Sequence, residues 1–237
     1  MRPNSHSRIA IIGAGGRAGS AVTAAARTRG HEVAAIVRDT SRHTHLTGLG
    51  ASVVAGDALN AETLKTATAG ADGIVLAVTP FTAPPQSLDG FDAGYYERIT
   101  ENALLAAKSN VVPRLIVIGL FATLRTADGS LVADDEKLLP SWLRPFAAAH
   151  AAGVERLRTL GDQVDWLAIT PPPHLGHETP TTGRYTLGTD VFDPAAGTSP
   201  LSYGDLATAV VDQIDQPTHH REQLAVYAAP PGHSRGI

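Results

Sequence analysis

The sequence predicts an α/β fold with a doubly wound parallel sheet, and three observations support this prediction. Short runs of β-branched and aliphatic residues alternate along the chain with longer, often alanine-rich stretches of helical propensity. The first two of these apolar runs are joined through a glycine-rich turn and one helix. A strand, a turn, a helix and a second strand within about 30 residues form a βαβ unit, whose crossover connection makes the two strands parallel.

The first half of the chain supplies predicted strands and helices in regular alternation. Strands are expected at 8–12, 31–37, 52–55, 73–78 and 114–118. Helices are expected at 20–29, 40–49, 62–69 and 95–108. Gly30 is expected to end the first helix, and Asn60 to cap the third. Residues 79–94 contain three prolines and are predicted to form a loop.

The second half begins in the same way and then changes character. A helix at 146–160 and a strand at 165–169 complete the regular alternation. Residues 170–200 are rich in Pro, Gly and Thr, with one strand-like piece at 184–187. A helix follows to about residue 214, with Ser202 as its cap and Asp205 in a capping-box position, and the last strand is expected at 222–227. We therefore predict one domain over 1–237, in which 170–237 form a small C-terminal excursion on the substrate side.

Composition excludes several classes of protein. Of the 237 residues, 43% are hydrophobic and 18% are charged, which excludes disorder over most of the chain. The absence of cysteine excludes disulfides, thiolate metal sites and cysteine nucleophiles. A net charge of −4 gives no electrostatic basis for binding nucleic acid or anionic lipid, and no apolar run approaches the ~18 residues of a membrane span. We expect a soluble, cytoplasmic protein.

The glycine-rich turn carries the clearest functional signal. Gly13, Gly16 and Gly19 fit the pattern G-x-x-G-x-x-G, and Gly15 adds the shorter G-x-G. In such a turn the first glycine bends the chain out of the strand, the second lets the backbone approach a pyrophosphate, and the third lets the helix pack closely on the sheet. The N–H groups of the following residues, among them Arg17 and Ala18, then face the phosphates. We expect a dinucleotide to bind here, in a fold of the Rossmann type.

The end of the second strand predicts which dinucleotide binds. NAD enzymes usually place an acidic residue there to hold the ribose hydroxyls, whereas arginine accommodates the 2′-phosphate of NADP. The sequence has Arg38 followed by Asp39, with Arg42 just beyond and Arg17 in the turn. We expect NADPH in preference to NADH, because guanidinium groups bind phosphate in a bidentate manner. In the alternative, the arginines are solvated and Asp39 binds the ribose.

Several segments resemble the atypical short-chain dehydrogenase/reductase superfamily over nearly the whole chain. The nearest groups in pattern are the NAD(P)H-binding proteins around biliverdin reductase B, a flavin reductase, and the NmrA-like regulators. The segments that carry the resemblance are 9–19, 31–39, 54–58, 71–75, 114–119, 164–166, 170–172 and 202–207. The resemblance implies that Asp57 and Ala58 border the adenine. It also implies that Ala77, Val78 and Thr79 line the ribose side of the cofactor and that the residues from Gly119 to Phe121 face the nicotinamide.

The sequence departs from this family at the catalytic residues. Standard short-chain dehydrogenases use a Tyr-x-x-x-Lys pair, in which lysine lowers the pKa of the tyrosine for proton transfer. No such pair occurs in the chain, and the helix that would carry it has His150 in an alanine-rich stretch. The proton donor is therefore left unknown, with His150 and Tyr95 as candidates. The alternative for His150 is an ordinary helix histidine.

Other polar and aromatic residues suggest substrate contacts but no metal site. Phe81, Phe121 and His174 fall at or just beyond the predicted carboxyl ends of strands, where parallel sheets bind ligands. These side chains either line the substrate cleft or cover the core and loops. The histidines lack the ligand spacing that zinc requires, so no metal is expected, and the absence of Gly-x-Ser-x-Gly disfavours a hydrolase.

These observations favour an NADPH-dependent reductase that transfers hydride to a small, planar acceptor such as a flavin, a quinone or a conjugated carbonyl. An alternative is a protein that senses NADP(H) without turnover. A third is an isomerase or epimerase with a resident NAD(P). The expected partner is a small-molecule substrate rather than nucleic acid or membrane, and the sequence leaves a homodimer open.

Overall fold

A computed structural model describes residues 6–81, 85–176 and 178–230, and it confirms the doubly wound sheet. The sheet has eight strands, and β8 alone runs antiparallel to its neighbour, β10. Their order is β3 (Ser52–Ala55), β2 (Glu32–Val37), β1 (Arg8–Ile12), β4 (Gly73–Leu76), β5 (Arg114–Ile118), β6 (Asp165–Thr170), β10 (Glu222–Ala228) and β8 (Tyr185–Leu187). The direction of winding reverses between β1 and β4. This switch point is where such sheets bind ligands.

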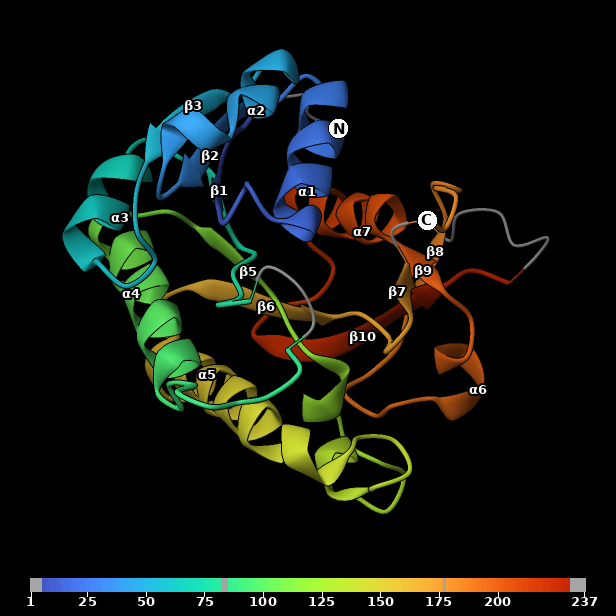
Figure 1. Cartoon of the computed structure of the whole chain (residues 1–237). Coiled ribbons are helices and arrows are strands. Elements are labelled where there is room, and N and C mark those ends of the chain that lie inside the picture. Colours follow the sequence, from blue (N-terminus) through green and yellow to red (C-terminus); the bar gives the residue numbers. More distant parts are fainter. Residues whose placement is uncertain (1–5, 82–84, 177, 231–237) are drawn as a thin grey trace.

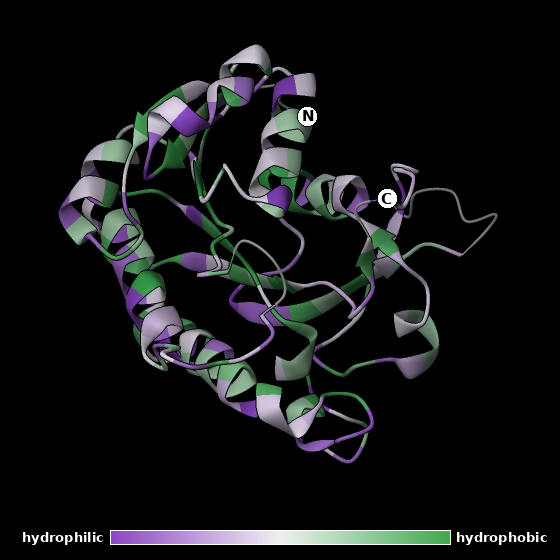
Figure 2. Cartoon of the chain, viewed as in Figure 1, coloured by the Kyte–Doolittle hydropathy of each residue, from purple (hydrophilic) through white to green (hydrophobic). Residues whose placement is uncertain are grey.

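Helices cover both faces of the sheet (Figure 1). One face carries α1 (Arg17–Thr28), α2 (Thr44–Gly48) and α7 (Tyr203–Asp215), and the other carries α3 (Ala61–Ala67), α4 (Tyr95–Ser109) and α5 (Arg144–Leu160). Side chains along β1 point alternately to the two faces of the sheet and pack into two hydrophobic cores. Ile9 and Ile11 belong to the core with α1 and α7, whereas Ala10 and Ile12 belong to the core with α4 and α5. The strands are accordingly the most hydrophobic part of the chain (Figure 2). No helix among the described residues is long and apolar enough to cross a membrane.

Most element boundaries agree with the sequence prediction. Gly30 follows α1 with φ of +88°, a conformation that favours glycine, and the Asn60 side chain accepts hydrogen bonds from the N–H groups of Glu62 and Thr63. Two predictions were wrong. Helix α1 begins at Arg17 rather than at residue 20, and residues 40–49 form two short helices, η1 (Thr40–Arg42) and α2, instead of one.

The sequence did not predict the short elements of the second half. These are the 3-10 helices η2 (Phe121–Thr123), η3 (Val132–Asp134) and η4 (Ser141–Leu143), helix α6 (Pro194–Gly197), and the two-stranded sheet of β7 (Leu175–Gly176) and β9 (Leu201–Ser202). Ser202 caps α7 as expected. The Asp205 N–H donates to the Ser202 hydroxyl, which is one of the two bonds of the expected capping box. Among the described residues, its buried carboxylate accepts hydrogen bonds from the N–H groups of Thr182 and Gly183 instead of from the Ser202 N–H, and so holds that segment against α7.

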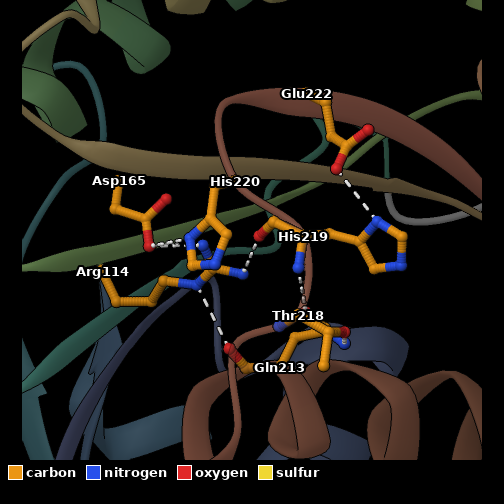
Figure 3. A network of polar contacts seen from close by, with 7 residues as sticks. All are labelled: Arg114, Asp165, Gln213, Thr218, His219, His220 and Glu222. Carbon is orange, nitrogen blue, oxygen red and sulfur yellow. Dashed lines mark hydrogen bonds and ion pairs between the residues drawn. The ribbon is translucent and has the colours of Figure 1, made fainter.

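A polar network lies at the amino-terminal ends of the central strands, at the opposite end of the sheet from the glycine turn (Figure 3). Arg114, at the start of β5, is buried and lies 2.8 Å from Asp165 at the start of β6. The same guanidinium donates to the backbone carbonyls of Gln213 and His219, at 3.2 and 2.9 Å. The Asp165 carboxylate also contacts the ring of His220 at 2.9 Å. This network joins the end of α7 and the connection to β10 to the central strands.

Candidate functional site

Three glycines of the turn after β1, Gly13, Gly16 and Gly19, have different surroundings. Gly13 adopts φ of +85°, and a β-carbon there would lie 2.5 Å from the carbonyl oxygen of Ala77. A β-carbon on Gly19 would lie 2.8 Å from the Gly13 carbonyl carbon. Gly16 is exposed, and the nearest atom to a β-carbon there is the Gly13 oxygen at 3.4 Å. The outer glycines therefore permit close packing, whereas Gly16 leaves an open surface above the turn.

The first turn of α1 offers backbone donors to this surface. Gly16 occupies the N-cap position without a side-chain cap, and the first turn contains no acidic residue. Within the described part of the chain, the N–H groups of Arg17, Ala18 and Gly19 have no backbone acceptor. Free donors and the helix dipole at this end favour an anionic ligand. This geometry suits the pyrophosphate of a dinucleotide.

Basic side chains gather at the carboxyl end of β2 and at the turn. Arg17, Arg38 and Arg42 are exposed, and none of them forms an ion pair with another described residue. Asp39 is engaged locally, because its Oδ1 atom accepts hydrogen bonds from the Ser41 hydroxyl at 2.6 Å and the Ser41 N–H at 3.0 Å. These bonds lower the pKa of the Asp39 carboxyl and make it the cap of η1. The arginines, in contrast, are free to bind an anion.

Tyr95 lies at the expected adenosine end of the site. Burial raises the pKa of Tyr95, while the positive charge of Arg38 opposes this shift and the negative charge of Asp57 adds to it. Ala58, next to Asp57, is held to α4 by a hydrogen bond from the Asn102 side chain to its carbonyl at 2.9 Å. Proximity to Arg38 and Asp57 argues against the proton-transfer role for which Tyr95 was a candidate.

A cavity of about 20 Å³ lies between the carboxyl ends of β4 and β5 and helices α4 and α5, with room for one water molecule. Its lining includes Val78 and Gly119, two of the expected cofactor residues, together with His150. The His150 ring stacks on Tyr96 with 3.5 Å between ring centroids and packs edge-on against Phe146 at 4.8 Å. Burial lowers the pKa of His150 to about 3, so the imidazole is neutral at pH 7. A neutral imidazole at pH 7 argues against His150 as an imidazolium acid.

The hydroxyl groups of Tyr96 and Thr123 already form hydrogen bonds within the protein. Tyr96 donates to Thr79 at 3.3 Å, and burial raises the pKa of the Tyr96 hydroxyl. Thr123, the hydroxyl residue that follows β5, is buried. It donates to the Leu120 carbonyl at 2.8 Å and accepts from the Gln223 amide at 2.8 Å. Neither hydroxyl has the features of a strong acid.

The three residues expected to contact substrate lie in different surroundings. Phe81 packs against the rings of Phe91 and Phe146, at 5.8 and 5.5 Å between centroids. Phe121 packs against Phe192, at 6.2 Å. His174 is exposed just before β7. The two phenylalanines thus belong to separate aromatic clusters.

The described residues contain no group of three or more histidines and carboxylates placed to hold a metal ion. His177 lies outside the described residues.

One histidine beside the turn was not among the predicted site residues. The ring of His43 lies against Gly15. The position of His43 one residue after Arg42 was the signal available in the sequence.

The fold, the glycine turn and the free donors are those of the dinucleotide-binding class of α/β proteins, which bind their ligands at the switch point of the sheet. Residues 13–217 match the family model described as NAD(P)H-binding, and the chain belongs to this family. The Bacillus subtilis protein YwnB is 31% identical over 229 residues, covering 92% of this chain and 97% of its own length.

Solved structures show the same fold. A protein from Burkholderia pseudomallei, described as a "putative exported protein", is 27% identical with a TM-score of 0.76, covering 93% of this chain and 99% of its own. A "putative NADH-flavin reductase" from Streptococcus pneumoniae is 24% identical with a TM-score of 0.77, covering 94% and 100%. A "putative epimerase" from Bacteroides thetaiotaomicron is 24% identical with a TM-score of 0.79, covering 97% and 100%.

Proposed function

We propose that this protein is an NADPH-dependent reductase that passes hydride to a small, planar acceptor. The observation that carries the preference for NADPH is the contrast at the end of β2. Arg38 and Arg42 have no ion-pair partner among the described residues, while Asp39 is bound to Ser41. A 2′-phosphate would give these guanidinium groups a bidentate partner, whereas the ribose hydroxyls of NADH would not.

The residues of the turn fit such a cofactor. The open surface at Gly16 and the free N–H groups of Arg17, Ala18 and Gly19 would hold the pyrophosphate. The remaining expected contacts are Gly13 and Gly15 in the turn, Asp57 and Ala58 at the adenine, and Ala77, Val78, Thr79 and Gly119 toward the nicotinamide. The bound nicotinamide would supply the hydride, and the protein would supply position and electrostatics.

The chemistry of the site favours an acceptor that needs no strong acid from the protein. His150 is neutral at pH 7, and burial raises the pKa of Tyr96. Flavins, quinones and conjugated carbonyls satisfy this condition, because solvent can protonate the reduced product. We expect Phe81, Phe121 and His174 to border the bound acceptor. The Streptococcus pneumoniae protein described as an NADH-flavin reductase shares the fold, which is compatible with this acceptor class.

Direct titration tests the proposal. The purified protein is titrated with NADPH and with NADH, and FMN or a soluble quinone is then added to the same sample while absorbance at the reduced nicotinamide band is followed. Tighter binding of NADPH and its consumption after acceptor addition are the expected results. Failure to bind either dinucleotide would refute the proposal.

The lack of a strong acid at this site also favours a second candidate function, a protein that binds NADP(H) and reports the redox state of the NADP(H) pool without turnover. Thr123, which follows β5, uses its hydroxyl inside the core and offers no acid to a substrate. Tight NADPH binding without consumption across flavin and quinone acceptors would select this alternative. We place either activity in the cytoplasm with a small-molecule ligand, and size-exclusion chromatography with light scattering would show whether the chain forms a homodimer.

A further inference from the structure

His43 occupies the space that a side chain at Gly15 would take. A β-carbon built on Gly15 would lie 2.6 Å from both the Nδ1 and Nε2 atoms of the His43 ring. Gly15 does not have the positive φ that requires glycine at Gly13. The packing of the His43 ring against the turn is therefore the structural reason for a glycine at position 15.

The imidazole of His43 packs against its neighbours, but its nitrogen atoms form no hydrogen bond with other described residues. His43 is the N-cap residue of α2, but its side chain makes no capping hydrogen bond. The ring is partly exposed and packs edge-on against His45 at 5.8 Å. Among the described residues, neither ring nitrogen of His43 has a hydrogen-bond partner. Both nitrogens are thus available to a ligand lying over the turn.

We propose that His43 is a third side chain of the pocket for the 2′-phosphate of NADP, beside Arg38 and Arg42. This inference rests on the proposed function and deepens it. A phosphate monoester next to the ring would accept a hydrogen bond from an imidazole N–H, and this bond is stronger when the ring is protonated. Gly15 makes the contact possible, because any side chain there would displace the ring from the turn.

The charged and titratable residues of the elements next to His43 are mostly basic. Arg17 is in the first turn of α1, Arg38, Asp39 and Arg42 are at the end of β2 and in η1, and His45 is in α2. Both Arg42 and His43 act electrostatically on the Asp39 carboxyl, which places the three groups close together. Asp57 follows β3, next to the strand that leads to Arg38. A bound 2′-phosphate would add negative charge to a cluster in which arginines outnumber carboxylates.

Binding constants at two pH values test the role of His43. The dissociation constants of NADP⁺ and NAD⁺ are measured by calorimetry at pH 6.0 and 8.5 for the wild type, His43→Gln and the matched control His45→Gln. We expect His43→Gln to weaken NADP⁺ binding about tenfold at pH 6.0, as for loss of a charged hydrogen bond, and only about two- to threefold at pH 8.5. NAD⁺ binding should change less than about twofold, and His45→Gln should match the wild type.

At each pH, the wild type and the variant bind the same mixture of phosphate protonation states, because the second pKa of such a phosphate, near 6, belongs to the ligand. Equal loss of NADP⁺ and NAD⁺ affinity in His43→Gln, or the same loss at both pH values, would overturn the role of His43. If the wild type binds NADP⁺ tightly and His43→Gln binds it with the same affinity, only this inference fails. If the wild type binds neither dinucleotide, the proposed function fails with it.

A second variant tests the role of Gly15. Gly15→Ala should weaken NADP⁺ binding in the wild type by pushing the His43 ring aside, but it should have little further effect in a His43→Ala background, where the added methyl group has room. Additive losses in the double variant would contradict the coupling between Gly15 and His43. Thermal unfolding of each variant confirms that a folded protein is being compared.

Discussion

Gly19 on α1 packs directly against Gly13 of the turn, and neither position has room for a side chain. A β-carbon at Gly19 would lie 2.8 Å from the Gly13 carbonyl carbon, and one at Gly13 would lie 2.8 Å from a methyl group of Val78. Gly16 lies between them in sequence, yet a β-carbon there meets no atom closer than 3.4 Å. The outer glycines thus fix the helix on the sheet, and the inner one keeps the surface above the turn open.

This difference predicts opposite effects for two valine variants. Gly16→Val should unfold at nearly the wild-type denaturant midpoint but lose NADPH and NADH binding, because the side chain would fill the space expected for the pyrophosphate. Gly19→Val should lose about 1–3 kcal/mol of unfolding free energy, or fail to fold, because it overpacks the helix against the turn. Urea denaturation and dinucleotide titration of both variants measure these effects. Unchanged affinity in Gly16→Val would show that the turn does not contact the cofactor.

Arg38→Ala tests the preference for NADPH. The variant should weaken NADPH binding by about 1.5–3 kcal/mol, the range for a hydrogen bond to a charged group, and leave NADH binding nearly unchanged. Arg98→Ala is a suitable control, since Arg98 is exposed on α4 and paired with Asp92. Affinities for both dinucleotides are measured by fluorescence titration. An equal loss of affinity for NADPH and NADH would show that Arg38 does not bind the 2′-phosphate.

The features of the fold that the sequence predicted are those determined by residues close to one another in the chain. The glycine turn, the Asn60 cap and Gly30 after α1 depend on residues a few positions apart, and strand β1 is recognisable from its own apolar run. The start of α1 was placed too late because Gly16 caps the helix with its backbone alone and provides no side-chain signal. The 3-10 helices near residues 121–143 are too short to produce a periodic pattern.

The parts of the site that the sequence did not predict depend on contacts between distant residues. The Gln223 amide donates to the Thr123 hydroxyl from 100 positions away, which removes that hydroxyl from the cleft. His150 is partly buried, its ring stacks on Tyr96 of another helix, and desolvation there lowers its pKa. Spacing within one helix indicates which residues share a face, but it does not show which ring from another helix lies on them.

The Arg114–Asp165 pair in Figure 3 predicts a loss of stability on charge removal. Asp165→Asn would leave the buried Arg114 guanidinium without its carboxylate partner, at a cost of about 1–3 kcal/mol in unfolding free energy, below the range for fully buried pairs because Asp165 is 30% exposed. Asp162→Asn is the control, since this carboxylate is 75% exposed and 3.6 Å from Lys108. Urea denaturation of both variants compares the two. Equal stability of Asp165→Asn and the wild type would show that the Arg114 guanidinium does not need the Asp165 charge.

His150 predicts a specific pH dependence of stability. Burial lowers its pKa from the ordinary 6.5 to about 3, so between these values the unfolded chain binds a proton that the folded chain does not. Stability from this group is therefore complete above pH 6.5 and is lost as pH falls toward 3, with a slope of at most about 1.4 kcal/mol per pH unit. His150→Phe keeps an aromatic ring between Tyr96 and Phe146 but cannot titrate. Urea denaturation from pH 4.5 to 7.5 should show a steeper loss on acidification for the wild type than for His150→Phe. Parallel curves for the two proteins would mean that the His150 ring accepts a proton in the folded state, which would restore it as an acid for the reaction.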